Sequence, residues 1–173
     1  RWNFVTLTDG FDPSGTEGQE LESGESFSWM FYRAFYRTDR RKNVIAQFFT
    51  RYGDFYNGQR FAGEVGLTFR FPPVLQIQID GEYNAVRLPE PFNNSDLLLL
   101  SPRIDLTLNN NLFLTTFVQL NTQEKNLGHN TRLQWRFKPV SDVFLVYTDN
   151  YITNGLQTLN RAIVFKVNYW LNL

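Results

Sequence analysis

His129 and Asp149 are the residues whose types could perform catalytic chemistry. His129 is the single histidine of the chain, and an imidazole beside a carboxylate can serve as a general base. A turn at Pro139-Val140 would bring the two residues close together at one rim of the fold. By alternation, however, His129 falls with Leu133 and Trp135 rather than with the polar residues. A catalytic dyad is therefore the weak candidate, and a solvated loop histidine is favoured.

Metal and phosphate sites are not expected. The acidic stretch Asp9–Glu25 could attract calcium, but its spacing matches no ordered set of ligands. The chain has no cysteine, so neither a disulfide nor a thiolate metal site can form. Gly63, Gly66 and Gly81 lie inside predicted strands with no helix following, which does not fit a phosphate loop. We predict no cofactor and no metal, and we expect bending or close packing of strands at these glycines.

The elements that must position these residues are strands. The last stretch, 160–173, alternates between an apolar set that includes Phe165 and Tyr169 and a mixed set that includes Lys166. A period of two over this length predicts a long strand with two unlike faces. The same reading gives about ten strands and no helix. The expected strands are 2–8, 27–37, 44–55, 60–71, 75–87, 97–108, 112–121, 130–138, 142–149 and 160–173.

The connections between these strands suggest an up-and-down arrangement. Long polar loops are expected near residues 17, 92, 125 and 155, with a modest turn at Asn57-Gly58, and short turns near 40, 72, 109 and 139. Alternation of long loops with short turns is typical of outer-membrane barrels. The fold class predicted is all-β, an antiparallel up-and-down transmembrane β-barrel that is complete or part of a larger barrel, and residues 1–173 form one domain.

The two faces of the predicted strands differ in chemistry. One set is expected to face a lumen, with charges of both signs pairing inside. The charged residues predicted to face the lumen are Glu64, Arg70, Asp80, Glu82, Arg103, Asp105, Arg132, Arg136 and Lys166. The other set is apolar with aromatic residues toward both ends, as in the interfacial girdles of a membrane barrel. The predicted lipid-facing and girdle residues are Phe61, Phe69, Phe71, Tyr83, Trp135, Phe137, Tyr147, Phe165 and Tyr169.

Composition agrees with this reading and excludes others. Aromatic residues make up 17% of the chain, and the formal net charge is +0. Strands and membrane interfaces use aromatic residues, whereas nucleic-acid binding would need a basic face. No apolar run is long enough for a transmembrane helix. A soluble up-and-down barrel that carries an apolar ligand has the same connectivity, and it is the main alternative.

Two stretches resemble known proteins. The run 133–147, which contains Trp135-Arg136, Pro139 and Ser141-Asp142, and the start Asn160-Arg161-Ala162 resemble the last hairpin and strand of a family of large Gram-negative outer-membrane proteins. In that family a carbohydrate-binding-module-like domain precedes a C-terminal barrel of unassigned function. The alternation Tyr169, Leu171, Leu173 is also similar to the terminal assembly signal of such barrels, with Leu173 in place of the usual Phe. The resemblance implies further strands upstream and lends no catalytic residues.

The expected function is that of an outer-membrane protein of a Gram-negative bacterium, acting as a structural, pore or docking module. Expected partners are outer-membrane lipid, lipopolysaccharide, the barrel-assembly machinery and other outer-membrane or surface proteins, with no nucleic acid. A rim-located hydrolase is the first alternative, because a ten-stranded barrel with His and Asp at its rim resembles outer-membrane proteases of the omptin type. A soluble carrier is the second.

Overall fold

A computed structural model describes residues 1–171 as a single antiparallel sheet. Its ten strands are β1 (Trp2–Thr6), β2 (Ser26–Arg37), β3 (Val44–Phe55), β4 (Gly58–Phe71), β5 (Leu75–Arg87), β6 (Ser95–Asn109), β7 (Leu112–Asn121), β8 (Asn126–Lys138), β9 (Ser141–Ile152) and β10 (Gln157–Asn168). The part of the chain described is all-β and contains no helix. Accordingly, it has no helix long and apolar enough to cross a membrane.

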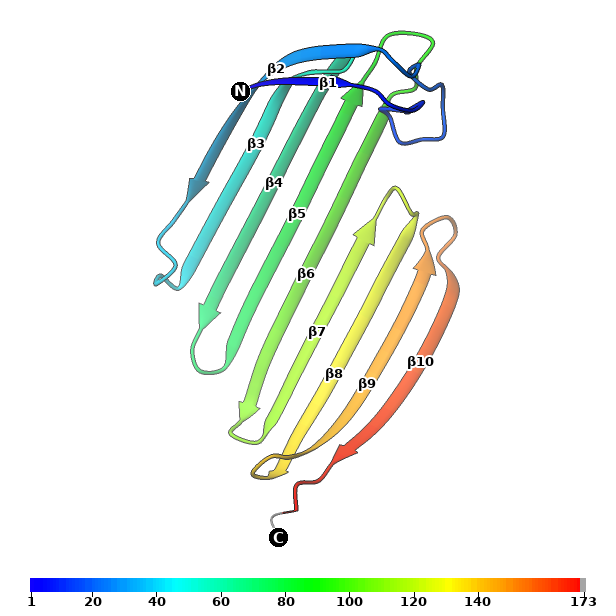
Figure 1. The fold of residues 1–173 in the computed structure, drawn as a ribbon. Helices are drawn as coiled ribbons and strands as arrows, with labels where there is room; N and C mark the ends of the chain where they lie inside the picture. Colours follow the sequence, from blue (N-terminus) through cyan, green and yellow to red (C-terminus); the bar gives the residue numbers. More distant parts are fainter. Residues whose placement is uncertain (172–173) are drawn as a thin grey trace.

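The strands follow one another in sequence order, so the sheet is an up-and-down meander. Each strand pairs with its neighbours in the sequence, from β1-β2 through to β9-β10. Figure 1 shows β3 to β10 side by side, whereas β1 and the first part of β2 cross over the upper ends of β3 to β5. β1 and β10 are the two edge strands of the sheet. The sheet is not closed, because β1 pairs only with β2 and β10 only with β9.

The two-residue turn between β3 and β4 shows how local sequence sets the register. Between β3 and β4 the chain turns through Tyr56-Asn57, and Tyr56 has a φ of 53°. The positive φ suits the mirror-image turns that match the twist of hairpins. Gly58 follows, where an added Cβ would collide with the backbone of Arg87. The turn therefore requires glycine here, and it sets the register that pairs Phe55 with Gly58.

The predicted strands are confirmed in number and order, but three details were wrong. β1 ends at Thr6 instead of residue 8, and the last strand ends at Asn168, so Tyr169 to Leu171 lie beyond it. Leu173 lies outside the described residues. The long loops expected after β7 and β9 are the short turns 122–125 and 153–156, because β8 and β9 extend further than their apolar residues indicated. Long and short connections therefore do not alternate strictly.

The register divides the side chains of the whole sheet into two faces. Directly paired residues share a face, so the pairs Leu67-Ile79 and Ile77-Ile104 belong to one face and the pair Glu64-Glu82 to the other. We call these the apolar face and the mixed face. The register also orients β2, which sequence alone could not: Tyr32 and Tyr36 pair with Tyr52 and Phe48 on the apolar face.

We call the two ends of the sheet end A and end B. End A carries the connections 7–25, 56–57, 88–94, 122–125 and 153–156, and end B carries 38–43, 72–74, 110–111 and 139–140. The two longest connections, 7–25 and 88–94, are both at end A, where Figure 1 shows them next to each other. The part of the sheet formed by β7 to β10 has only short turns at this end.

Loop 7–25 packs against the mixed face at end A. Its Phe11 ring lies 5.2 Å from the ring of Tyr56, which in turn lies 4.9 Å from Trp29 and 5.5 Å from Phe27, both on the mixed face. The loop also reaches the neighbouring connection, because Asn93 Nδ2 donates to Thr16 Oγ1 at 3.2 Å. Much of the small buried core of the protein lies here.

A buried turn inside this loop depends on Asp12. Its carboxylate accepts hydrogen bonds from Ser14 N at 2.8 Å, Ser14 Oγ at 2.6 Å, Gly18 N at 2.8 Å and Thr16 N at 3.1 Å. Partial burial raises the pKa of Asp12, but these four donors outweigh it and hold the pKa below its usual value. The loop is therefore stabilised by the ionised form of the carboxyl.

We predict that Asp12→Ala frees loop 7–25 at neutral pH. The amide hydrogens of residues 14, 16 and 18 should exchange about tenfold faster or more, since a charged acceptor of several hydrogen bonds is lost. In the native chain the stabilisation is complete above the usual carboxyl pKa of about 3.9 and is lost as the pH falls through the lowered pKa. Asp9→Ala is the control, because Asp9 accepts only from Thr8; equal effects of the two variants would contradict the assignment.

Candidate functional site

The mixed face gathers the charged residues that the sequence predicts to face a lumen. The register places all nine of them on this one face: Glu64, Arg70, Asp80, Glu82, Arg103, Asp105, Arg132, Arg136 and Lys166. They come from five strands, β4, β5, β6, β8 and β10, and lie between the middle of the sheet and end B. The prediction that this face lines a lumen stays a prediction, because the sheet is open.

Some of these charges pair along or across strands. Arg103 Nε lies 2.9 Å from Asp105 Oδ2, and Thr115 Oγ1 donates to the same carboxylate at 2.8 Å. Arg136 Nε lies 3.3 Å from Asp142 Oδ1. These pairs are partly exposed, so each contributes little to stability on its own. Their main effect is to fix the positions of charge over β6 to β9.

Other charges are arranged like against like. Arg33 of β2 lies directly opposite Arg51 of β3, and Glu64 lies directly opposite Glu82. Like charges in directly opposite positions destabilise a sheet. One network relieves part of this repulsion: Arg60 donates to Asn84 Oδ1 at 2.7 Å, and Asn84 Nδ2 donates to Glu82 Oε1 at 2.6 Å. The mixed face therefore has a basic strip on β2 and β3 beside an acidic strip on β4 and β5.

Two hollows on the mixed face follow from this arrangement. One, of about 230 Å³, lies over Gly66 between Gln47, Glu64 and Asp80. The other, of about 160 Å³, lies over Gly128 at end A of β7 to β9 and is lined mainly by amide side chains such as Asn126 and Asn150. Both are small; the first is lined by aromatic as well as charged side chains, including Phe35 and Phe49, and the second is mainly polar.

The apolar face carries aromatic side chains toward both ends. Tyr52, Phe61 and Tyr83 lie toward end A, and Tyr52 OH donates to Gln59 Oε1 at 3.1 Å. At end B the rings of Trp135 and Phe137 lie 5.8 Å apart, and Tyr169 stacks on Phe137 at 6.3 Å. The other predicted girdle residues on this face are Phe69, Phe71, Tyr147 and Phe165. Between the two ends the face is largely aliphatic.

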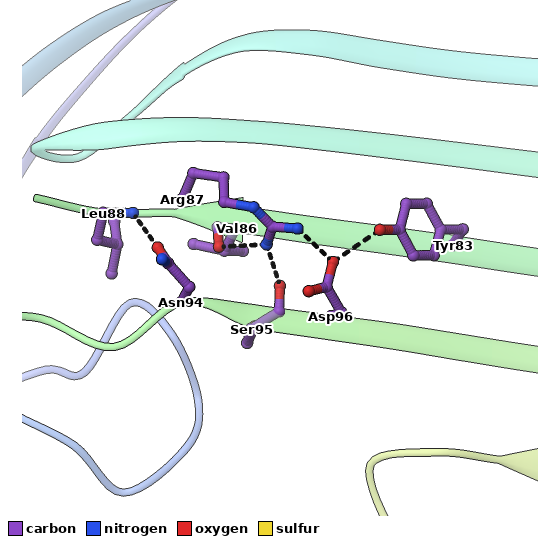
Figure 2. Close-up of polar contacts among 7 residues, drawn as sticks. All are labelled: Tyr83, Val86, Arg87, Leu88, Asn94, Ser95 and Asp96. Carbon is purple, nitrogen blue, oxygen red and sulfur yellow. Dashed lines mark hydrogen bonds and ion pairs between the residues drawn. The ribbon is translucent and has the colours of Figure 1, made fainter.

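A polar cluster closes the end-A side of the β5-β6 hairpin. Figure 2 shows Asp96 between Arg87 and Tyr83: Arg87 Nη2 lies 2.6 Å from Asp96 Oδ1, and Tyr83 OH donates to the same oxygen at 2.7 Å. Arg87 also donates to the backbone oxygen of Ser95 at 3.1 Å. The charged side chains are about half exposed, at 49% and 53%.

A related cluster at end A of β9 and β10 surrounds Asp149. Its Oδ2 accepts from Tyr151 OH at 2.6 Å, Tyr147 OH at 2.7 Å and Arg161 Nε at 2.7 Å. These side chains cover the carboxylate completely, so Asp149 is 0% exposed although it lies on a single-layer sheet. Asp149 Oδ1 is buried without a hydrogen-bond partner among the described residues.

His129 lies directly opposite Asp149 on the apolar face. The register confirms that His129 lies on the same face as Leu133 and Trp135, and it places Asp149 on that face as well. His129 is also not a loop residue, since β8 begins at Asn126. No hydrogen bond joins His129 to Asp149 in the described structure. His129 Nε2 instead lies 2.9 Å from Thr131 Oγ1 and 3.3 Å from Thr116 Oγ1.

Thr131 is the residue that sequence reasoning missed. It lies two positions after His129, so the period of a strand places both side chains on the same face. Threonine is common in strands, so its type alone carries no signal. The spacing His-x-Thr on β8, which pairs with the strand that carries Asp149, could have indicated that His129, Thr131 and Asp149 lie together. Within residues 1–171 no cluster of three or more His, Asp or Glu side chains is placed to hold a metal ion.

The two arginine-aspartate clusters predict different consequences of losing the arginine. Arg161→Met would leave the solvent-excluded Asp149 with only its two tyrosine donors, which should lower the melting temperature by several degrees. Arg87→Met should lower it much less, because both members of that pair are half exposed. Thermal unfolding of the two variants tests this. The double variant Asp149→Asn/Arg161→Met should regain part of the loss, and an equal effect of both arginine variants would contradict the reading.

Comparison of the chain with family models, with curated proteins and with solved structures finds no match. The resemblance of the last hairpin and strand to the family of large outer-membrane proteins stays a prediction.

Proposed function

We propose that this chain forms an arc of a transmembrane β-barrel in the outer membrane of a Gram-negative bacterium. In this proposal the apolar face contacts lipid, the mixed face lines the interior, and the protein acts as a structural, pore or docking module. The observation that carries the proposal is an apolar face that runs across all ten strands with no second layer over it.

Exposure of the uncovered apolar face to water is unfavourable in free energy. Ile163 and Phe165 of β10 are 71% and 67% exposed, and large apolar side chains on β1 and β2, such as Trp2, Phe4 and Tyr32, are similarly exposed. Transfer of each such side chain out of water is favourable by about 1.5–3 kcal/mol. A lipid environment supplies that transfer without a protein layer, which supports the membrane proposal.

The position of polar groups on the apolar face also supports it. The Tyr83-Arg87-Asp96 and Tyr147-Tyr151-Asp149-Arg161 clusters lie toward end A, and the Trp135-Phe137-Tyr169 stack lies at end B. Tyrosine and tryptophan favour the boundary between lipid and water, where the ring is apolar and its polar atom can be hydrated. The aliphatic middle would then match the hydrocarbon region.

The open sheet requires further strands in this proposal. Unpaired backbone N–H and C=O groups cannot remain in lipid, because each costs several kcal/mol. β10 has a free edge along its length, and β1 covers only Ser26–Met30 of β2. β1 and β10 run in opposite directions, so an even number of added strands keeps every pair antiparallel. We propose that such strands, from the same polypeptide or another chain, complete the barrel.

Single-cysteine labelling tests which face meets lipid. The chain has no cysteine, so each introduced thiol is unique. We choose Ile77→Cys and Ile104→Cys on the apolar face, and Gln76→Cys and Thr68→Cys on the mixed face; all four sites are half-buried. After refolding in lipid bilayers, the apolar-face thiols should resist water-soluble maleimide and the mixed-face thiols should react, because lipid excludes the charged reagent.

Refolding with and without detergent micelles provides the companion measurement. Folding only in micelles, seen as heat-modifiable gel migration and β-type circular dichroism, is the expected result. A chain that folds in plain buffer and protects both faces equally would contradict the proposal. A soluble chain that protects only the apolar face would favour the carrier of an apolar ligand.

A further inference from the structure

We propose that Thr131, His129 and Asp149 form a nucleophilic site on the apolar face that cleaves acyl esters. The inference goes beyond a structural or pore role, and its choice of substrate rests on the proposed contact of this face with lipid. The group consists of three residue types that carry nucleophilic catalysis: a hydroxyl, an imidazole and a carboxylate.

The hydroxyl and the imidazole are already in contact. Thr131 Oγ1 lies 2.9 Å from His129 Nε2, which is within the distance for a nucleophile and its base. Thr116 Oγ1 lies 2.7 Å from Thr131 Oγ1 and 3.3 Å from His129 Nε2. Thr116 can therefore hold the hydroxyl of Thr131 in place while the imidazole accepts its proton.

The carboxylate is placed to orient the imidazole. Asp149 is directly opposite His129 in the register, so their side chains leave the same face at neighbouring positions. Asp149 Oδ1 is buried without a partner, and His129 Nδ1 has no hydrogen-bond partner among the described residues. One hydrogen bond from Nδ1–H to Oδ1 would satisfy both atoms. Such contacts are commonly long before substrate binds and shorten in the complex.

The side chains around Asp149 hold its carboxylate in place through Oδ2 and leave Oδ1 free. Tyr147, Tyr151 and Arg161 all bind Oδ2, so Oδ1 remains available to His129. The ring of Tyr147 also lies 5.8 Å from the imidazole ring and restricts its orientation. In this arrangement Asp149 is a positioning residue.

The substrate class follows from where the group lies. It is toward end A on the apolar face, with the aliphatic side chains of Leu133 and Leu145 next along the sheet toward end B. An acyl chain can lie along these apolar residues while its ester group reaches the polar cluster. A membrane lipid with ester-linked acyl chains has both parts in this order, so we assign it as the substrate class.

The reaction balances without a metal or redox partner. Thr131 Oγ attacks the ester carbonyl, and His129 Nε2 takes the hydroxyl proton. The C–O bond to the alcohol breaks, and His129 returns the proton to the departing alkoxide, which leaves as a lyso-lipid. Water, activated by His129, then attacks the acyl-threonine and releases a free fatty acid and the original hydroxyl.

The test measures fatty-acid release from phosphatidylethanolamine in mixed micelles by the full chain refolded with detergent. We expect release that falls by on the order of 10³-fold or more in Thr131→Val, because the nucleophile is removed. Thr131→Ser should retain release. Thr148→Val is the matched control, since Thr148 lies on the mixed face with its hydroxyl bound to Asn130, and release should be unchanged.

Two further readouts separate chemistry from folding. A fluorophosphonate should modify Thr131, detected by peptide mass spectrometry, and His129→Gln should abolish that modification. Asp149→Asn should lower kcat with little change in KM, as expected of a positioning residue. Asp149→Ala is less suitable, because it removes the acceptor of three donors and can unfold the cluster.

Different experimental results would contradict the catalytic site and the membrane proposal. No release from a chain that folds in micelles and shows the expected cysteine pattern would overturn the inference and leave the membrane proposal standing. Release that is equal in Thr131→Val and in the native chain would also overturn it. A chain that folds only in buffer would overturn the membrane proposal, and a water-soluble short-chain ester would then test the three residues by the same variants.

Discussion

The structure depends on one constraint: a single antiparallel layer with no second layer to cover it. Every neighbouring pair of strands from β1 to β10 is antiparallel, and small register shifts occur only at β6-β7, β8-β9 and β9-β10. A sheet in water normally buries one face against another element. Here the few buried apolar side chains gather around loop 7–25 and the adjacent strand ends. Backbone hydrogen bonds therefore hold the layer together, and the environment of its two faces decides whether it is stable.

The same register explains why charged and apolar side chains gather on different faces of the sheet. Because opposite residues share a face, a sequence with period two carries most charges onto one side and most aliphatic side chains onto the other. The charged rows at Arg33-Arg51 and Glu64-Glu82 are one result. The Arg87-Asp96 pair and the Asp149 cluster are exceptions, since both put charged groups on the apolar face. A buried charge there needs several donors, and Asp149 has three.

Much of the fold could be predicted from the sequence, because alternation and turn residues are local signals. Strand number, order and face followed from residues such as Phe61 to Phe71 and from Asn57-Gly58. The extents of β8 and β9 did not, because Asn126, Gly128 and Asn150 are residue types that usually indicate loops, and here they pair with the neighbouring strand. The burial of Asp149 depends on Arg161 of the neighbouring strand β10, so the stretch around Asp149 alone does not indicate it. Whether the sheet closes is likewise a property of its edges rather than of any motif.

Loop 7–25 makes end A unequal across its width. Its contacts with Tyr56 and Asn93 hold it over the β2 to β5 side, whereas the β7 to β10 side carries only the turns 122–125 and 153–156. In the proposed barrel, loop 7–25 would cover about half of the opening at end A. A molecule that approaches end A would meet loop 7–25 and its Phe11 on the side of the basic strip. It would enter on the other side, along the amide side chains of β7 to β9. Entry would thus be directional, and the short turns rather than the long loop would decide what fits.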